Sequence, residues 1–219
     1  MFITFEGLDF SGKTTQAVRA VERLQDLAGA GEAPPVHFLR EPGGTRISER
    51  IREMLLDKAN LDMGELTELL LFSASRAQLV REIIRPALER GEIVVCDRYC
   101  DSTTAYQGYG RGIDLALVRA VNTAATGGTM PDLTLVIDIP VDEIARRKDR
   151  AGMAFDRMES AGRAFYERVR QGYRDLAAQE PRRFVIVDGT GSIDTIGQDV
   201  WRHLSCRLKI HQRERKRDS

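Results

Sequence analysis

The sequence predicts a single α/β domain with a five-stranded, mainly parallel β-sheet flanked by helices. Five short segments of aliphatic and β-branched residues recur along the 219-residue chain. Most are continuously apolar, which is typical of strands covered by helices on both faces. Helical patterns alternate with them, as a parallel sheet requires. The chain is long enough to bury one core.

In chain order, the predicted strands are residues 2–6 (FITFE), 36–40 (VHFLR), 93–97 (IVVCD), 133–139 (LTLVIDI) and 184–188 (FVIVD). The predicted helices are residues 13–28, 48–57, 65–90, 115–125, 142–149, 160–179 and 193–208. A glycine- and proline-containing loop, residues 29–35, joins the first helix to the second strand. No internal repeat or low-complexity linker divides the chain, so we expect one domain over 1–208 and a basic C-terminal tail over 209–219.

Between the first strand and the first helix, Gly7, Gly12, Lys13 and Thr14 match the pattern G-x-x-x-x-G-K-[ST]. Glycines let successive backbone N–H groups point at phosphate oxygens, and the start of the helix adds positive charge. We expect Lys13 to reach the β- and γ-phosphates of ATP, as an exposed side chain, and the Thr14 hydroxyl to bind Mg²⁺. The predicted ATP-binding residues are Gly7, Leu8, Asp9, Phe10, Ser11, Gly12, Lys13, Thr14 and Thr15. The alternative is a glycine turn beside a surface lysine.

Asp97 ends the third predicted strand, where phosphate-loop proteins place an acid that holds the metal or its water shell. We therefore predict that Asp97 and Thr14 form the Mg²⁺ site. The alternative for Asp97 is a side chain that caps the turn after the strand.

An acceptor for the phosphate is indicated by residues 97–108 (DRYCDSTTAYQG). Arg98 follows the strand-end acid and can hold a second phosphate by two parallel hydrogen bonds, while Tyr106 and Gln107 can shape a pocket for a sugar or base. Phe72 and Arg76 lie four residues apart on a predicted helix, so they share a face suited to stacking on a base and donating to its carbonyl oxygens. A core phenylalanine beside a surface arginine remains the alternative.

Six blocks carry a resemblance over residues 5 to about 160: FEGLDFSGKTTQ, REPGGTRISERIR, LLLFSASRAQ, DRYCDSTTAYQGYGRG, PDLTLVIDIPVDEIARRKDRAG and FDRMES. In this order and spacing the sequence resembles the thymidylate kinase family, and the DRY block is its most specific part. The resemblance implies a P-loop nucleoside monophosphate kinase fold. It also implies transfer of the γ-phosphoryl group of ATP to dTMP, which gives dTDP in dTTP biosynthesis.

The resemblance further implies a role for each predicted acceptor residue. Phe72 stacks on thymine, Arg76 hydrogen-bonds its carbonyl edge and Gln107 helps to hold the base. Tyr106 crowds the 2′ position of the sugar, and Arg98 holds the dTMP phosphate. Asp9 lies between the two nucleotides and joins Lys13 and Arg98 among the catalytic residues. Arg40 and Arg46 are weaker candidates for phosphate contacts, and Glu159 is one for the acceptor pocket.

Phe10 occupies the position at which some members of the family carry an arginine; others supply that arginine from a lid. Residues 146–157 are a basic segment suited to such a lid, so the sequence is similar to the lid-arginine type. We expect Arg150 to be the catalytic lid arginine, with Arg146 as the second candidate. Phe10 is bulkier than the small residue usual in that type and is expected to change the packing over the phosphates.

Two other functions stay open at this point: a kinase for another nucleoside monophosphate or a deoxynucleoside, and a P-loop nucleotide-binding module without turnover. Equal numbers of basic and acidic side chains, 33 of each, argue against a nucleic-acid partner. No apolar run is long enough to span a membrane, and three cysteines without a metal-ligand pattern predict a cytoplasmic protein. The expected partners are dTMP and ATP, and the family resemblance implies a homodimer.

Overall fold

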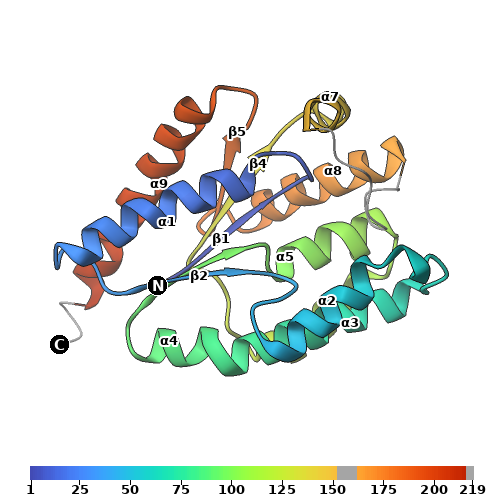
Figure 1. Ribbon diagram of the computed structural model, residues 1–219, viewed down its shortest axis with the longest axis horizontal. Coiled ribbons are helices and arrows are strands. Elements are labelled where there is room, and N and C mark those ends of the chain that lie inside the picture. Colours follow the sequence, from blue (N-terminus) through green and yellow to red (C-terminus); the bar gives the residue numbers. More distant parts are fainter. Residues whose placement is uncertain (152–161, 216–219) are drawn as a thin grey trace.

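Five parallel strands in the order β2-β3-β1-β4-β5 form the centre of the computed structural model (Figure 1). The model describes the backbone of residues 1–151 and 162–215, and the side chains of 1–148 and 162–208. The strands are β1 (Phe2–Gly7), β2 (Val36–Arg40), β3 (Ile93–Asp97), β4 (Leu133–Asp138) and β5 (Phe184–Asp188). All four pairings are parallel, so the predicted fold class is confirmed and each strand lies within one residue of its predicted bounds.

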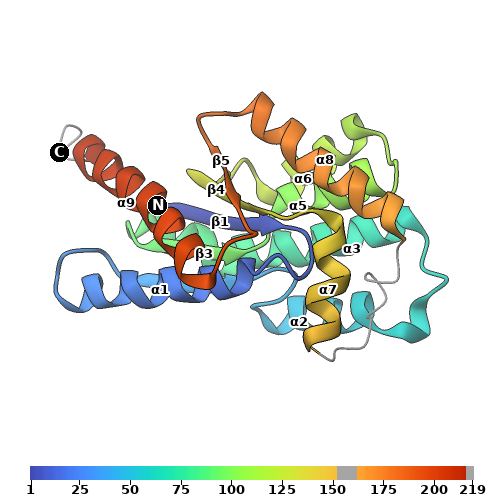
Figure 2. The same cartoon turned by 90° about the horizontal axis from the view of Figure 1, so that it is seen from above.

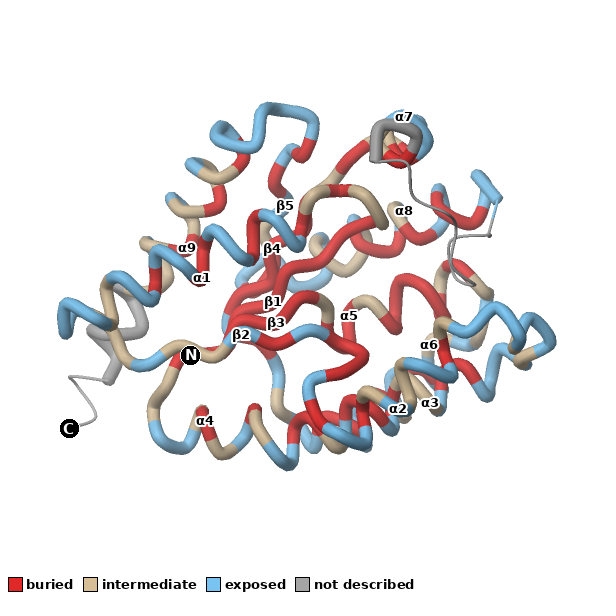
Figure 3. Tube along the Cα trace, in the orientation of Figure 1, coloured by how far each residue is buried: buried red, intermediate tan, exposed pale blue. Residues whose placement is uncertain are grey.

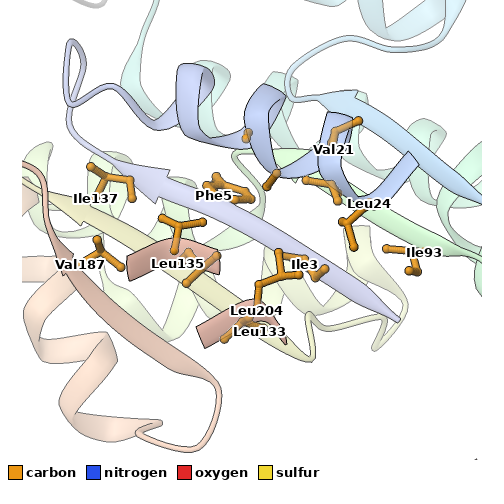
Figure 4. Close-up of a cluster of buried hydrophobic side chains, with 14 of the residues drawn as sticks. Ile3, Phe5, Val21, Leu24, Ile93, Leu133, Leu135, Ile137, Val187 and Leu204 are labelled. Carbon is orange, nitrogen blue, oxygen red and sulfur yellow. The ribbon is translucent and has the colours of Figure 1, made fainter. Parts of the chain in front are cut away.

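One face of the sheet is covered by α1 (Lys13–Gly29) and α9 (Ile193–Arg215), which lie side by side in Figures 1 and 2. Ile3 and Phe5 of β1 point toward this face, because alternate residues of a strand point to opposite faces. They pack with Leu24 of α1 and Leu204 of α9 in the cluster shown in Figure 4. The apolar side chains of β1 therefore hold α1 against the sheet, with its first residue directly after the loop that joins β1 to α1.

The other face carries two further clusters. Phe2, Val94 and Cys96 pack against the helical segment made of α3 (Glu65–Leu79), η2 (Val80–Ile84) and α4 (Arg85–Glu89). Val136 and Phe184 pack against η3 (Thr104–Gly110), α7 (Val141–Ala151) and α8 (Arg163–Gln179). The central strands are buried along their length (Figure 3), which explains their continuous apolar sequences.

The predicted helices are present, with altered bounds. The helix predicted over 65–90 contains a wider π-helical turn, η2, directly before Pro86, whose ring has no N–H and would clash with a carbonyl in a regular α-helix. The second helix, α2 (Arg46–Leu56), begins two residues earlier than predicted because the Thr45 hydroxyl accepts a hydrogen bond from the Ser48 amide. Helix α9 continues to Arg215 instead of ending at residue 208. A short 3₁₀ helix, η1 (Lys58–Asn60), and α6 (Leu115–Thr126) complete this part of the fold.

The sequence did not predict a helix after β3, yet residues 100–110 form α5 (Cys100–Thr103) and the π-helical η3. Threonines and glycines there have weak helix propensity. Packing of η3 against α8 stabilises the segment: Gly110 lies against Phe165 and Gly172 lies against Tyr109. This unpredicted helical segment carries two of the five predicted acceptor residues, Tyr106 and Gln107.

Candidate active site

The loop between β1 and α1 has the backbone geometry of an anion-binding loop. Gly7 and Gly12 have φ angles of 136° and 90°, and Phe10 has a φ of 60°. A Cβ atom on Gly7 would lie 2.5 Å from the Ile137 carbonyl oxygen, so only glycine fits there. Helix α1 starts at Lys13 without a side-chain cap from Gly12, and the Lys13 amide makes a long contact of 3.4 Å with Ser11 Oγ, so this end of the helix is suited to a bound anion.

Lys13 is buried, with 7% of its surface exposed, so the expected exposed lysine is wrong. Its ammonium group donates to the Leu8 carbonyl at 3.3 Å and lies 4.0 Å from Asp9 Oδ1. Burial and the nearby Arg98 lower the pKa of Lys13, while the charges of Asp97, Asp9 and Glu6 act in the opposite direction. The loop thus folds its lysine back onto its own carbonyl group.

Thr14 and Asp97 are brought together by strand register. Phe5 of β1 is paired with Asp97 of β3, so the carboxyl ends of the two strands are adjacent. The Thr14 hydroxyl donates to Asp97 Oδ2 at 2.5 Å. Asp97 Oδ1 is buried and has no hydrogen-bond partner within the part of the chain that the structure describes. A hydroxyl and an unsatisfied carboxylate oxygen beside a phosphate-type loop are suitable ligands for a hard divalent cation.

Arg98 joins the loop to the segment after β3. Its Nη2 atom donates to Asp9 Oδ1 at 2.5 Å and to the Tyr106 hydroxyl at 3.1 Å. The Tyr106 hydroxyl also donates to Asp9 Oδ2 at 3.1 Å. Burial raises the pKa of Asp9, but the Arg98 and Lys13 charges and these hydrogen bonds outweigh it and lower that pKa overall. An ionised Asp9 therefore lies between Lys13 and Arg98.

A cavity of about 150 Å³ opens next to this arrangement and is called the acceptor cavity below. It is lined by Asp9, Glu41, Pro42, Arg52, Leu56, Phe72, Arg76, Arg98, Tyr99, Ser102, Thr103, Tyr106 and Gln107. All five predicted dTMP-binding residues are in this list. The structure therefore brings residues from α3 and η3 together around one cavity, with Arg98 at the end nearest the phosphate-binding loop.

Arg76 is completely buried in the wall of the acceptor cavity, which excludes the alternative of a surface arginine. Its Nε lies 2.7 Å from Glu41 Oε1, Nη1 donates to Asn122 Oδ1 at 2.9 Å, and Nη2 donates to the Thr103 hydroxyl at 2.8 Å. Burial raises the pKa of Glu41 to about 7, while Arg76 acts to lower it. Sequence patterns did not indicate Glu41 or Asn122, which lie far from Arg76 along the chain.

Phe72 of α3 and Gln107 of η3 both line the acceptor cavity. Phe72 is half-buried and packs against the cluster around Tyr106, which leaves part of its ring toward the cavity. The Gln107 amide nitrogen donates to Glu68 Oε1 at 2.9 Å, and Arg111 donates to the same carboxylate. Glu68 was also missed, because a glutamate in an amphipathic helix ordinarily faces solvent.

In the described part of the predicted lid, the arginine that contacts the phosphate loop is Arg147, which was not one of the two predicted candidates. Arg147 of α7 donates to the carbonyl groups of Phe10 and Ser11 at 3.3 and 3.0 Å, and to that of Gly189 at 2.6 Å. Arg146 is exposed and pairs with Glu143. The Arg150 side chain and Glu159 lie outside the described residues.

The described side chains of the remaining predicted residues do not line the acceptor cavity. Arg40 is exposed and donates to Glu49, whose other oxygen accepts from the Gly44 amide. Arg46 and Thr15 are exposed, whereas Leu8 is buried and half-buried Phe10 packs at the edge of its cluster.

The described helices include none that is long and apolar enough to cross a membrane.

Taken together, an all-parallel five-stranded sheet, a G-x-x-x-x-G-K-T loop and an arginine-lined cavity beside it define a P-loop nucleoside monophosphate kinase.

Comparison with known proteins specifies the family. The family model described as Thymidylate kinase matches residues 5–200, so the chain belongs to the thymidylate kinase family. The thymidylate kinase of Syntrophotalea carbinolica is 46% identical over 214 residues, which are 95% of this chain and 97% of that protein. The thymidylate kinase of Deinococcus radiodurans is 49% identical over 207 residues, with 94% and 97% covered. The crystal structure of the Ehrlichia chaffeensis thymidylate kinase superposes with a TM-score of 0.75 at 37% identity, and covers 94% of this chain and 98% of that one.

Proposed function

We propose that the protein transfers the γ-phosphoryl group of ATP to dTMP, giving dTDP for dTTP biosynthesis. The observation that carries this proposal is the acceptor cavity, which holds Phe72 and Arg76 on its walls and opens at Arg98 and Asp9 toward the ATP loop. Phosphoryl transfer depends on positioning two anionic groups and neutralising their charge. Placing an arginine-lined cavity against a phosphate-binding loop meets both needs.

On the ATP side, residues 7–15 hold the phosphates through backbone N–H groups. Lys13 leaves the Leu8 carbonyl and moves onto the β- and γ-phosphates when ATP binds. Thr14 and Asp97 would hold Mg²⁺ directly or through its water shell, and the ion would supply positive charge against the phosphates of ATP.

On the dTMP side, Phe72 stacks on thymine, Arg76 donates to its carbonyl edge and Gln107 helps to hold the base. Tyr106 crowds the 2′ position and favours deoxyribose. Arg98 holds the dTMP phosphate and Asp9 orients Arg98, so the acceptor oxygen faces the γ-phosphate. Thr103 and Arg52, which also line the cavity, extend this acceptor set.

A lid over residues 146–157 within the single domain 1–208 supplies the remaining positive charge, with Arg150 as its catalytic arginine and Arg146 as the second candidate. Closure excludes water that would otherwise hydrolyse ATP. Arg147 supports this proposal, because it already contacts the carbonyl groups of the phosphate loop from α7.

Initial rates of ADP release with Mg-ATP and, in turn, dTMP, dUMP, dCMP, UMP and thymidine test the proposal. We expect dTMP to give the highest kcat/KM. A higher value for another monophosphate would keep the P-loop mechanism and overturn the base assignment. Absence of turnover with every acceptor, from folded protein that binds ATP, would favour the nucleotide-binding module.

The protein is also proposed to act as a cytoplasmic homodimer. Helices α3 and α6 pack against each other and expose three leucines, Leu66, Leu70 and Leu117, with 52%, 49% and 43% of their surfaces accessible. A second copy of the chain would cover them. Light scattering after size exclusion is expected to give twice the chain mass, and Leu70→Glu is expected to give the monomer mass. A monomeric parent protein would contradict the dimer.

A further inference from the structure

Glu6 is a completely buried acid on β1 that lies directly before the phosphate-binding loop. It points to the sheet face opposite Phe5, toward the segment after β3 and toward α8. A buried carboxylate is costly unless its oxygens accept hydrogen bonds. The hydrogen-bond donors around the Glu6 carboxylate therefore show how its burial is stabilised.

Every hydrogen-bond neighbour of Glu6 that the structure describes is a donor. Oε1 accepts from the Tyr99 amide at 2.7 Å. Oε2 accepts from the Ser102 hydroxyl at 2.5 Å and from the Tyr173 hydroxyl at 2.9 Å. These groups come from β3's C-terminal loop, α5 and α8, so one carboxylate joins three elements.

The same two hydroxyl groups also contact Arg98. Its Nη1 atom lies 3.0 Å from the Ser102 oxygen and 3.4 Å from the Tyr173 oxygen, and it also donates to the Gly7 carbonyl at 3.1 Å. An arginine can only donate, and each hydroxyl has a single proton. The hydroxyl oxygens lie 2.9 Å apart and compete for those protons, but an ionised carboxylate is the strongest acceptor present. Protons drawn toward Glu6 leave the oxygen lone pairs for Arg98.

The hydrogen bond from the Tyr99 amide to Glu6 also stabilises the backbone of Arg98. Arg98 has a φ of 71°, a left-handed conformation that is unfavourable for a residue with a long side chain. The next amide, that of Tyr99, is the one bound by Glu6 Oε1. Glu6 therefore stabilises both the turn that contains Arg98 and the hydroxyl groups that hold its guanidinium.

We propose that Glu6 is a positioning residue that fixes Arg98, through Ser102, Tyr173 and the Tyr99 amide, so that its guanidinium group faces the acceptor cavity. The inference rests on the role proposed above for Arg98. An amide at this position would place its NH₂ group either against the donating Tyr99 amide or toward the Ser102 and Tyr173 hydroxyls, which would then have to accept from it. With the NH₂ group toward the hydroxyls, their protons would turn toward the Arg98 cation.

A thermodynamic cycle tests this role. The dissociation constant of dTMP is measured by titration calorimetry at pH 8 for the parent protein, Glu6→Gln, Arg98→Ala and the double variant. We expect Glu6→Gln alone to weaken dTMP binding about tenfold to a hundredfold. In the Arg98→Ala background we expect less than about a twofold further change. Glu89→Gln, on the exposed side of α4, is the matched control and should leave binding unchanged.

An equal loss from Glu6→Gln in both backgrounds, or no loss in either, would overturn the proposal, because a merely structural role does not depend on Arg98. If Glu6→Gln fails to fold, Tyr173→Phe is used in its place in the same cycle. We expect Tyr173→Phe to weaken dTMP binding less than Glu6→Gln does, and only in the protein that retains Arg98. Failure of the proposed function is distinguished at the first step, since the parent protein would then not bind dTMP.

Discussion

Arg76 shows how a single side chain is fixed in the acceptor cavity. Its nitrogen atoms contact Glu41, Asn122 and Thr103, which belong to three separate segments of the chain. Only a guanidinium group has donors in enough directions to contact all three. The side chain therefore has one orientation before a nucleotide binds, and this reduces the entropy lost on binding.

Arg76→Ala is expected to raise the KM for dTMP and also to lower the free energy of unfolding by about 3–5 kcal/mol, because Glu41 would remain buried without its cation. Adding Glu41→Gln should restore most of the stability but not the dTMP binding. Denaturant titration and steady-state kinetics on the single and double variants measure the two effects. Equal losses of stability in both backgrounds would show that the ion pair does not explain the effect.

The residues of the candidate site were predictable where a local pattern marks their chemistry. The phosphate loop and Asp97 follow from spacing and from their places after strands, whereas the base-binding role of the Phe72–Arg76 pair followed only from the family resemblance. Glu41, Asn122 and Glu6 were not predictable in the same way. Each acts through a partner more than 30 positions away, and sequence spacing carries no information about such contacts until the fold is known.

At the scale of elements, the packing of η3 against α8 maintains the shape of the acceptor cavity. Two glycines permit it: a Cβ on Gly110 would lie 2.6 Å from Phe165 Cε2, and one on Gly172 would lie 2.7 Å from Tyr109 Cγ. Phe165 in turn makes an edge contact with the Tyr106 ring at a centroid distance of 5.9 Å. The position of Tyr106 therefore depends on how closely the two helices approach.

Gly110→Ala is expected to destabilise the protein by about 1–3 kcal/mol, since the added methyl group displaces Phe165. The KM for dTMP should also rise, because displacing Phe165 moves the Tyr106 ring that it contacts. Thermal unfolding measures the loss of stability, and steady-state kinetics measure the KM. Gly29→Ala, at the end of α1 with no atom within 4 Å of its added Cβ, is the control and should be neutral or slightly stabilising. Unchanged stability in Gly110→Ala would contradict this account of the helix pair.

The regular elements of the fold could be predicted because their apolar periodicity continues for a full strand or several helical turns. Segment 100–110 could not, because it is short and its sequence has weak helix propensity. Tertiary contacts with α8 stabilise it instead. Two of the acceptor residues, Tyr106 and Gln107, thus lie on the element that local sequence determines least.

At the scale of the whole molecule, the site lowers stability at neutral pH. Burial raises the pKa values of Glu6 and Glu41 from their ordinary value of 4.5 to about 7, although neighbouring arginines act to lower both. Each acid binds its proton more tightly in the folded protein than in the unfolded chain. Stability from these groups is fully present below pH 4.5 and is lost as the pH rises through about 7.

The free energy of unfolding should therefore fall more steeply between pH 4.5 and 7 in the parent protein than in Glu6→Gln, which cannot titrate. The two curves should diverge over this window by up to roughly 3 kcal/mol. Denaturant titrations at several pH values give both curves, with Glu89→Gln again as the control. Parallel curves would mean that Glu6 does not have a raised pKa.

Direct phosphoryl transfer from ATP to dTMP by the P-loop site can be followed by ³¹P NMR of a reaction with Mg-ATP and dTMP. We expect dTDP and ADP to form in equal amounts, and Lys13→Ala to lower the rate of both by about two orders of magnitude or more. Formation of ADP without dTDP, or dTDP formation that does not need Lys13, would contradict the account.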